Sequence, residues 1–320
     1  MLVTERPYFM IVGCRRSGTT LLKSILSAHS SIHVCQETFF FHSVAPRLHA
    51  LSETPEKVAN LWWLADAGLT PDMLQPLIRT RLGEGKELTC AVFSAILDFH
   101  AKSFPDSIIG EKSASHVNHL DVITKCLPNV KIIQIVRDPR AVLASSRKVN
   151  IGSNSLYDLV DEWKSSVQVL DKWAGRTCFR TLLYEDLVIN TEDTLRGICD
   201  FLDVNWESTM LDFHSRKEDG YAKEQTHHIN TRKPLFTDSI ESWKTDLPSG
   251  DIALIDAVLG RRMKRFGYKT AGLQISNIAF RMACSRIVGQ LHRFLVRVPR
   301  QRLKAFKAKS RLRAKRSSGF

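Results

Sequence analysis

Residues 13–20, "GCRRSGTT", have the outline of a phosphate-binding loop of the type G-x-x-x-x-G-K-[ST]. Both glycines and the closing threonine are present, but Thr19 stands where the lysine belongs, and positive charge lies earlier, at Arg15 and Arg16. In nucleoside triphosphatases that lysine and a Mg²⁺ ion neutralise the β- and γ-phosphates. The loop therefore keeps the means to bind a phosphate and lacks the residue that grips a triphosphate.

The backbone of this loop forms an anion site whatever its side chains are, because successive amides and a helix start point at the ligand. The amides in question belong to Ser17, Gly18, Thr19 and Thr20. A buried apolar run, Tyr8–Val12, precedes the loop, and residues 19–29 have a helical period. Strand, loop and helix in this order are the setting that a phosphate-binding loop requires.

A second strand candidate, Lys131–Val136, ends in Arg137 and Asp138. A metal-binding aspartate ends the corresponding strand of nucleoside triphosphatases, and a cation beside Asp138 disfavours that role. Together with the missing lysine, this replaces metal-ion chemistry by guanidinium chemistry. The pattern suits a nucleotide that lacks a γ-phosphate and carries an extra phosphate elsewhere.

The chain alternates strand and helix, which predicts an α/β fold of P-loop type with a mainly parallel sheet flanked by helices. Four apolar runs are strand candidates: Tyr8–Val12, Ser107–Gly110, Lys131–Val136 and Cys178–Leu183. Helical patterns cover residues 19–29, 116–126, 140–148, 155–174, 191–202 and 249–265, and 39–106 is expected to be a helical insert. A charged motif follows each strand, so we expect one site at the carboxyl ends of the strands.

Charge divides the chain into a predicted catalytic domain, residues 1–270, and a basic amphipathic tail, residues 271–320. The formal net charge is +13, yet 18 of the 46 Lys and Arg residues, and no Asp or Glu, lie in 261–320. The tail either contacts an anionic membrane surface or packs on its own domain and stays solvated. A basic tail also suits nucleic acid, which is the less expected of the two anionic partners.

The seven cysteines are scattered singly, and an odd number fits no closed disulfide framework. We therefore expect a reduced, cytoplasmic location, with contact to the membrane only at its surface. The N-terminus carries charges where a signal peptide needs an apolar run, and we expect no membrane-spanning helix. Four histidines, His29, His116, His227 and His228, form no metal-ligand spacing, so no metal is expected.

Three motifs, taken in order, resemble those of the 3′-phosphoadenosine-5′-phosphosulfate (PAPS)-dependent sulfotransferases. Their loop for the 5′-phosphosulfate looks like "RRSGTT", residues 15–20 here. Their 3′-phosphate motif is an arginine at a strand end with a serine eight residues on, which Arg137 and Ser145 match. Tyr184 of "YEDL" resembles the tyrosine beside the nucleotide. The resemblance covers roughly residues 7–268 and implies PAPS as the sulfonate donor and product PAP, with no metal.

The most similar motifs belong to the bacterial members and the tyrosylprotein sulfotransferases, in which "RSGTTLL…AH" is followed by a catalytic glutamate before threonine. "CQET" puts Glu37 there, as the base for the acceptor's proton. Arg16 and Lys112 match residues that stabilise charge on the transferred group. Two structural alternatives stay open: Glu37 pairs with a loop arginine, or Lys112 is a surface lysine.

The resemblance thus implies nine nucleotide contacts: Arg15, Arg16, Ser17, Gly18, Thr19, Thr20, Arg137, Ser145 and Tyr184. Two positions depart from the family pattern. Arg15 replaces a proline, and Ser242 precedes Trp243 where a basic residue is common. Which residue of the late loop closes over the nucleotide is therefore open among Arg232, Lys233 and Lys244.

The sequence favours a sulfotransferase that acts on a hydroxyl of a glycan, a lipid-linked sugar or a small molecule. A protein tyrosine acceptor is less expected, because neither an N-terminal anchor nor a disulfide framework is visible. Two alternatives from other classes are a P-loop kinase or NTPase using ATP and Mg²⁺, and a catalytically silent nucleotide-binding membrane scaffold. The missing loop lysine argues against the first, and the set of Glu37, Arg16 and Lys112 argues against the second.

Overall fold

A five-stranded parallel sheet forms the centre of the chain in a computed structural model, which describes residues 7–48, 70–149, 155–215 and 234–272. The strand order is β2-β3-β1-β4-β5, so β1 lies in the middle, beside β3 and β4. The strands are β1 Tyr8–Gly13, β2 Ile32–Cys35, β3 Ile108–Lys112, β4 Lys131–Val136 and β5 Phe179–Leu183. All six residues of β1 are buried, which is why its sequence is a continuous apolar run.

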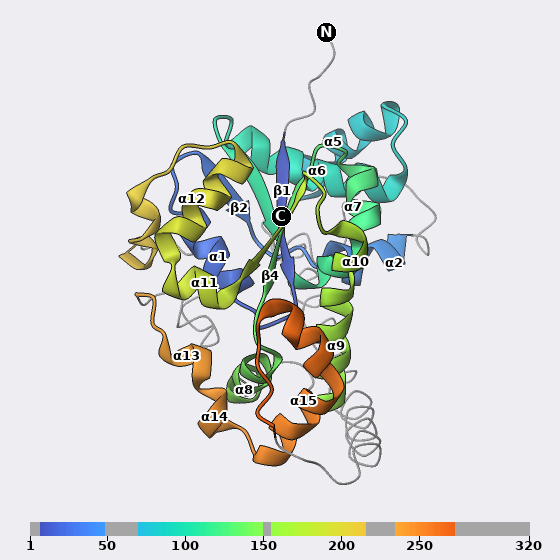
Figure 1. The fold of residues 1–320 in the computed structure, drawn as a ribbon. Helices are drawn as coiled ribbons and strands as arrows, with labels where there is room; N and C mark the ends of the chain where they lie inside the picture. The colour runs from blue at the N-terminus through green and yellow to red at the C-terminus, as the bar shows by residue number, and fades with distance from the viewer. Residues whose placement is uncertain (1–6, 49–69, 150–154, 216–233, 273–320) are drawn as a thin grey trace, which may run out of the picture.

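Helices cover both faces of the sheet (Figure 1). One face packs on α1 (Thr19–Leu26), α11 (Tyr184–Ile189) and α12 (Thr191–Leu202). The other packs on a larger group: α5 (Pro71–Gly83), α6 (Leu88–Ser103), α7 (Leu120–Cys126), α9 (Leu156–Gln168) and α10 (Leu170–Trp173). A short α2 (Ala45–Leu48) and the 3₁₀ helix Ala114–His119 belong to this side.

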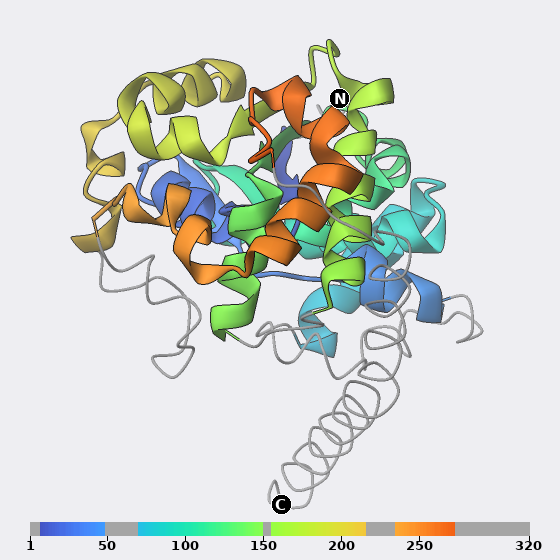
Figure 2. The ribbon, with the colours of Figure 1, turned by 60° about the horizontal axis from the view of Figure 1, so that its bottom comes forward.

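Four further helices gather beyond the carboxyl ends of the strands (Figures 1 and 2). They are α8 (Pro139–Val149), α13 (Asp238–Glu241), α14 (Trp243–Asp246) and α15 (Ser249–Met263). The chain leaves β1 for β2 and β3 on one side and only then reaches β4 on the other. This reversal next to β1 is where open parallel sheets bind ligands.

The predicted fold class is confirmed, and each of the four predicted strands lies within two residues of its expected bounds. The sequence reasoning missed β2, a four-residue edge strand that pairs with β3 alone.

Of the helical insert expected over 39–106, residues 49–69 lie outside the described part. The tail beyond 272 and the late-loop residues 216–233 lie outside it too. The tail's membrane contact therefore stays a prediction. Among the described residues, no helix has the length and apolar character needed to span a bilayer.

The expectation that the cysteines stay unpaired was wrong. Cys90 of α6 and Cys126 at the end of α7 form a disulfide, while Cys14, Cys35, Cys178 and Cys199 are free. Sequence spacing could not show this pair, because 36 residues separate the two cysteines and only the packing of the two helices brings them together. Disulfides persist mainly in oxidising compartments, so the cysteine argument for a cytoplasmic location no longer holds.

Breaking this disulfide should destabilise the domain, because it closes a loop with a sequence separation of 36 residues. Replacing Cys90 and Cys126 by alanine should lower the free energy of unfolding by about 2–4 kcal/mol, measured by urea denaturation. Cys178→Ala, at a free and half-buried cysteine, is the matched control and should change it by less. Identical unfolding curves of the wild-type chain with and without dithiothreitol would show that the bond does not form.

Candidate active site

The loop between β1 and α1 takes an unusual backbone path. Arg16 has φ 64° and Gly18 has φ 103°, and both values lie in the left-handed region. Gly18 is required there for a second reason, since a Cβ at this position would lie 2.5 Å from Cδ2 of Tyr184. The amide of Ser17 donates to the carbonyl of Cys14 at 3.2 Å, which closes the turn. The first turn of α1 then begins at Thr19, directly after the glycine.

A cavity of about 250 Å³ opens over this loop at the carboxyl end of the sheet. Seven of the eleven predicted site residues line it: Arg16, Gly18, Thr19, Thr20, Arg137, Ser145 and Tyr184. They come from the loop, the first turn of α1, the end of β4, the second turn of α8 and the start of α11. The late-loop residues 234–236, 238–239 and 242 form the opposite wall. The structure thus brings the two predicted phosphate motifs to one cavity.

Arg137 is held in place by groups that leave its charge uncompensated. It is only 6% exposed. Its Nη1 donates to the carbonyl of Arg16 at 3.2 Å and its Nη2 to that of Ser239 at 2.6 Å. Its guanidinium carbon lies 4.0 Å from the centre of the Tyr184 ring. Behind it, the buried indole of Trp163 donates to the carbonyl of Arg137 itself at 2.9 Å.

Arg16 brings a second guanidinium to the same cavity. Its Nε donates to the hydroxyl of Ser145 at 3.2 Å, which links the loop to α8. Burial, and then the charge of Arg137, lower the pKa of Arg16. Within the described residues, neither Arg16 nor Arg137 forms an ion pair with a carboxylate. Arg16 and Arg137 therefore bring to the cavity two positive charges that call for an anion.

Two polar atoms next to the cavity strengthen this case for an anionic ligand. The hydroxyl of Ser17 and Nε of Arg137 are buried without a hydrogen-bond partner among the described residues. Buried polar groups nearly always have partners, and a bound phosphate supplies acceptors for both. The residues present thus fit a nucleotide phosphate.

Glu37 and Lys112 lie next to each other, on the side of the loop that faces β3. Oε1 of Glu37 is 2.7 Å from Nζ of Lys112, which also donates to Oγ1 of Thr20 at 3.1 Å. Lys112 is fully buried, so it is not a surface lysine, whereas the side chain of Glu37 is 23% exposed. Glu37 therefore pairs with Lys112 rather than with a loop arginine, and its carboxylate remains open to solvent.

Arg15 is turned away from the cavity. Its Nε lies 3.2 Å from Oε2 of Glu162 on α9, and its amide donates to Oε1 of the same carboxylate at 3.1 Å. Among the described residues, this contact ties the loop to the helix. The predicted contact between Arg15 and the nucleotide stays a prediction.

Asp138 has a structural role. Its carboxylate accepts hydrogen bonds from Nη2 and Nε of Arg140, at 2.6 Å to Oδ2 and 3.0 Å to Oδ1. Arg140 also pairs with Asp256 at 3.2 Å and stacks 3.8 Å from the centre of the Trp243 ring. Within the described ranges, no group of three His, Cys, Asp or Glu side chains is arranged to hold a metal ion. Asp138 is thus committed to Arg140, which disfavours the role of a Mg²⁺ ligand in an NTPase.

The model of the sulfotransferase family matches residues 7–208. The chain belongs to this family. It is 26% identical to protein-tyrosine sulfotransferase A of Caenorhabditis elegans over 274 residues, covering 82% of this chain and 67% of that one. Protein-tyrosine sulfotransferase 2 of Gallus gallus is also 26% identical, with 82% and 70% covered. Family membership confirms the predicted enzyme class and, with it, PAPS as the donor.

Two solved sulfotransferase domains share the fold. The domain of the Synechococcus PCC 7002 olefin synthase has a TM-score of 0.60 at 21% identity, with 82% of this chain and 95% of that domain covered. The domain of the curacin biosynthetic pathway has a TM-score of 0.58 at 18% identity, with 82% and 98% covered. Both likenesses support the predicted arrangement of sheet and helices.

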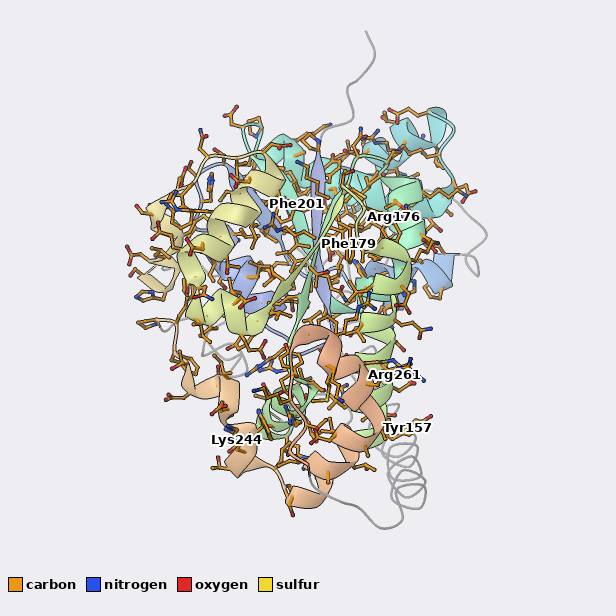
Figure 3. All side chains as sticks on the ribbon, in the orientation of Figure 1. Tyr157, Arg176, Phe179, Phe201, Lys244 and Arg261 are labelled. Atoms are coloured by element: carbon orange, nitrogen blue, oxygen red, sulfur yellow. A yellow bond between two sulfur atoms is a disulfide. The ribbon has the colours of Figure 1, made fainter. Side chains whose placement is uncertain are left out.

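Lys148 is a lining residue of this sulfotransferase that the sequence reasoning missed. It follows Ser145 by three positions on α8, so the two share a helix face, and both line the cavity. Its Nζ lies 2.6 Å from Oδ2 of Asp246. Of the three late-loop candidates, Arg232 and Lys233 lie outside the described residues. Lys244 lies on α14 (Figure 3) and is not among the residues that line the cavity; its Nζ is 2.6 Å from Oε1 of Glu241.

Removing Lys148 should weaken nucleotide binding, whereas removing Lys244 should not. Each lysine forms one ion pair with a carboxylate, and the two side chains are similarly exposed, at 59% and 53%. Only Lys148 lines the cavity. We expect Lys148→Ala to raise the Kd of 3′,5′-adenosine bisphosphate, measured by isothermal titration, by roughly 3–10-fold, since an exposed charge contact contributes about 1 kcal/mol. Equal Kd values for the two variants would remove Lys148 from the site.

Proposed function

We propose that this sulfotransferase moves the sulfonate group of PAPS to a hydroxyl of a glycan, a lipid-linked sugar or a small molecule, with Glu37 as the general base. One observation supports the base role most directly: a partly exposed carboxylate is fixed beside the phosphate-binding loop by a buried lysine that also donates to Thr20. The acceptor hydroxyl can reach this carboxylate, and PAPS can reach the loop.

The proposed reaction forms a bond between the acceptor oxygen and sulfur while the bond from sulfur to the phosphate oxygen of PAPS breaks. Glu37 takes the hydroxyl proton, and the electron pair of the broken bond leaves with the bisphosphate product. Arg16 lies in the loop and lines the cavity, and Lys112 donates to Thr20 at the start of α1. Both stabilise negative charge on the transferred group and on the leaving oxygen. In a buried site such donors contribute about 3–4 kcal/mol each. Arginine stays protonated, so Arg16 acts by its charge alone.

Lys112 has a second effect on the base. Its ammonium lies 2.7 Å from Oε1 of Glu37 and so holds the carboxylate in place. Because the same ammonium donates to Oγ1 of Thr20, the base and the loop keep one relative position. We propose that this shared lysine aligns the acceptor oxygen with the sulfonate.

A tyrosine side chain is a second candidate acceptor. The two relatives described above are named protein-tyrosine sulfotransferases, and the disulfide between Cys90 and Cys126 removes one of the reasons against such an acceptor. A panel of an acidic tyrosine peptide, 2-naphthol and N-acetylglucosamine separates the candidates. Release of 3′,5′-adenosine bisphosphate from PAPS measures each rate, with water as the acceptor in the control without added hydroxyl compound.

Glu37→Gln should reduce turnover about 10²–10⁴-fold, because the amide keeps the shape of the side chain and cannot take a proton. The Kd for 3′,5′-adenosine bisphosphate should change little, since Glu37 does not line the nucleotide cavity. Glu207→Gln is the matched control, because its side chain is 29% exposed against 23% for Glu37, and it should turn over like the wild type. A wild-type rate for Glu37→Gln would end the base role.

A further inference from the structure

The carboxylate of Glu111 is fully buried at the end of β3, and the chemistry proposed above leaves it without a role. Glu111 directly precedes Lys112 in the strand, so the two side chains point to opposite faces of the sheet. Burying a carboxylate is costly unless hydrogen bonds compensate it. Part of the compensation comes from Thr38, the residue that follows Glu37, and the rest from Ser113 and His116.

Three hydrogen bonds converge on Oε1 of Glu111. The amide of Thr38 donates at 3.1 Å and its hydroxyl at 2.9 Å, and the hydroxyl of Ser113 is the third donor. Nδ1 of His116 lies 3.0 Å from Oε2. Burial by itself raises the pKa of Glu111, but His116 and these hydrogen bonds outweigh it and hold the pKa below its usual range. The carboxylate is therefore ionised and acts only as an acceptor.

The groups that contact Glu111 also accept hydrogen bonds from the backbone that follows Glu37. The amide of Phe39 donates to Ser113 Oγ at 3.1 Å, and that of Phe40 to Thr38 Oγ1 at 3.2 Å. The amide of Phe41 donates to Nε2 of His116 at 3.4 Å, and Nδ1 of the same ring lies 3.0 Å from Oε2 of Glu111. The carboxylate of Glu111 is thus linked through Thr38, Ser113 and His116 to the backbone amides of residues 39–41.

The backbone held in this way is strained at one residue. Phe39 has φ 47°, which costs a residue with a side chain roughly 1–2 kcal/mol. Its ring is 44% exposed, while the rings of Phe40 and Phe41 are buried. Such a conformation persists where the surroundings over-determine it and is typical of functional sites. Here the surroundings are the hydrogen bonds from Thr38, Phe39 and Phe41.

We propose that Glu111 is a positioning residue for the base. Through Thr38, Ser113 and His116 it fixes the backbone on one side of Glu37, while Lys112 from the same strand fixes the carboxylate on the other. This inference rests on the general-base role proposed for Glu37. It assigns a function to all three residues of "EKS", residues 111–113. Lys112 pairs with the side chain of Glu37, Glu111 accepts hydrogen bonds from Thr38, and Ser113 accepts one from the amide that follows.

The sharpest test compares Thr38→Val with Thr38→Ser. Valine keeps the shape of threonine and removes both the donor to Glu111 and the acceptor for Phe40, whereas serine keeps the hydroxyl. Turnover is followed as release of 3′,5′-adenosine bisphosphate from PAPS, with whichever acceptor of the panel is fastest in the wild type, or with water. We expect Thr38→Val to lose 10-fold or more in kcat, because a misplacement of about 1 Å costs up to 10²-fold. Thr38→Ser should stay within about twofold.

Glu111→Gln should lower kcat more than Thr38→Val does, and it should leave the Kd for the bisphosphate unchanged. The amide presents a donor to the donors around it, which disrupts the set without changing its volume. Asp98→Asn is the control for a general loss of stability. Asp98 is a partly buried carboxylate that contacts Tyr8 and Arg81, which are distant from it in sequence. It should lower the melting temperature and keep kcat.

The outcomes separate this inference from the function on which it rests. A slow Glu37→Gln with wild-type rates in Thr38→Val and Glu111→Gln would overturn the positioning role alone. Equal rates in Thr38→Val and Thr38→Ser would do the same, as would a kcat loss in Asp98→Asn as large as that in Glu111→Gln. A wild-type rate in Glu37→Gln would instead overturn the base role, and the inference with it.

Discussion

Two guanidinium groups, that of the buried Arg137 and that of the half-buried Arg16, share one cavity and form no ion pair within the described part of the chain. Like charges in a partly buried site repel each other, and desolvation adds to the cost. The domain tolerates them because backbone carbonyls, a serine hydroxyl and the face of Tyr184 hold both groups. An anionic ligand supplies the missing negative charge, so nucleotide binding relieves the repulsion between the two guanidinium groups.

The fold provides what this arrangement needs from elements far apart in sequence. The parallel sheet puts the ends of β1 and β4 side by side, which brings the loop and Arg137 together. Trp163 on α9 fixes the carbonyl of Arg137 from behind, and Asp138 is neutralised by Arg140, so that the carboxylate next in sequence does not compete for Arg137. On the other side of β1, β3 delivers Lys112 to the loop and to Glu37. Glu37 and Lys112 thus reach the loop at Thr20, a residue that also lines the cavity.

The sequence predicted the parts of the site that depend on local backbone geometry. A glycine loop after a buried strand, and Arg137 followed by Ser145, have spacings that one turn and one helix dictate. It did not predict Lys148, Glu111 or the disulfide, because these depend on how helices and loops pack across the sheet. The edge strand β2 was missed since four residues give too short a pattern. The predicted contact between Arg15 and the nucleotide stays a prediction, and the pairing of its side chain with Glu162 across to α9 was not foreseen from the sequence.

The central claim is that guanidinium groups, rather than a lysine and Mg²⁺, recognise the nucleotide. Isothermal titration of the full chain with 3′,5′-adenosine bisphosphate in EDTA, and separately with ATP and Mg²⁺, tests it directly. The account predicts tight binding of the bisphosphate without metal and much weaker binding of ATP with Mg²⁺, because the loop lacks the lysine for a γ-phosphate and Arg137 with Ser145 awaits a 3′-phosphate. Tight binding of ATP with Mg²⁺, together with weak binding of the bisphosphate, would contradict it.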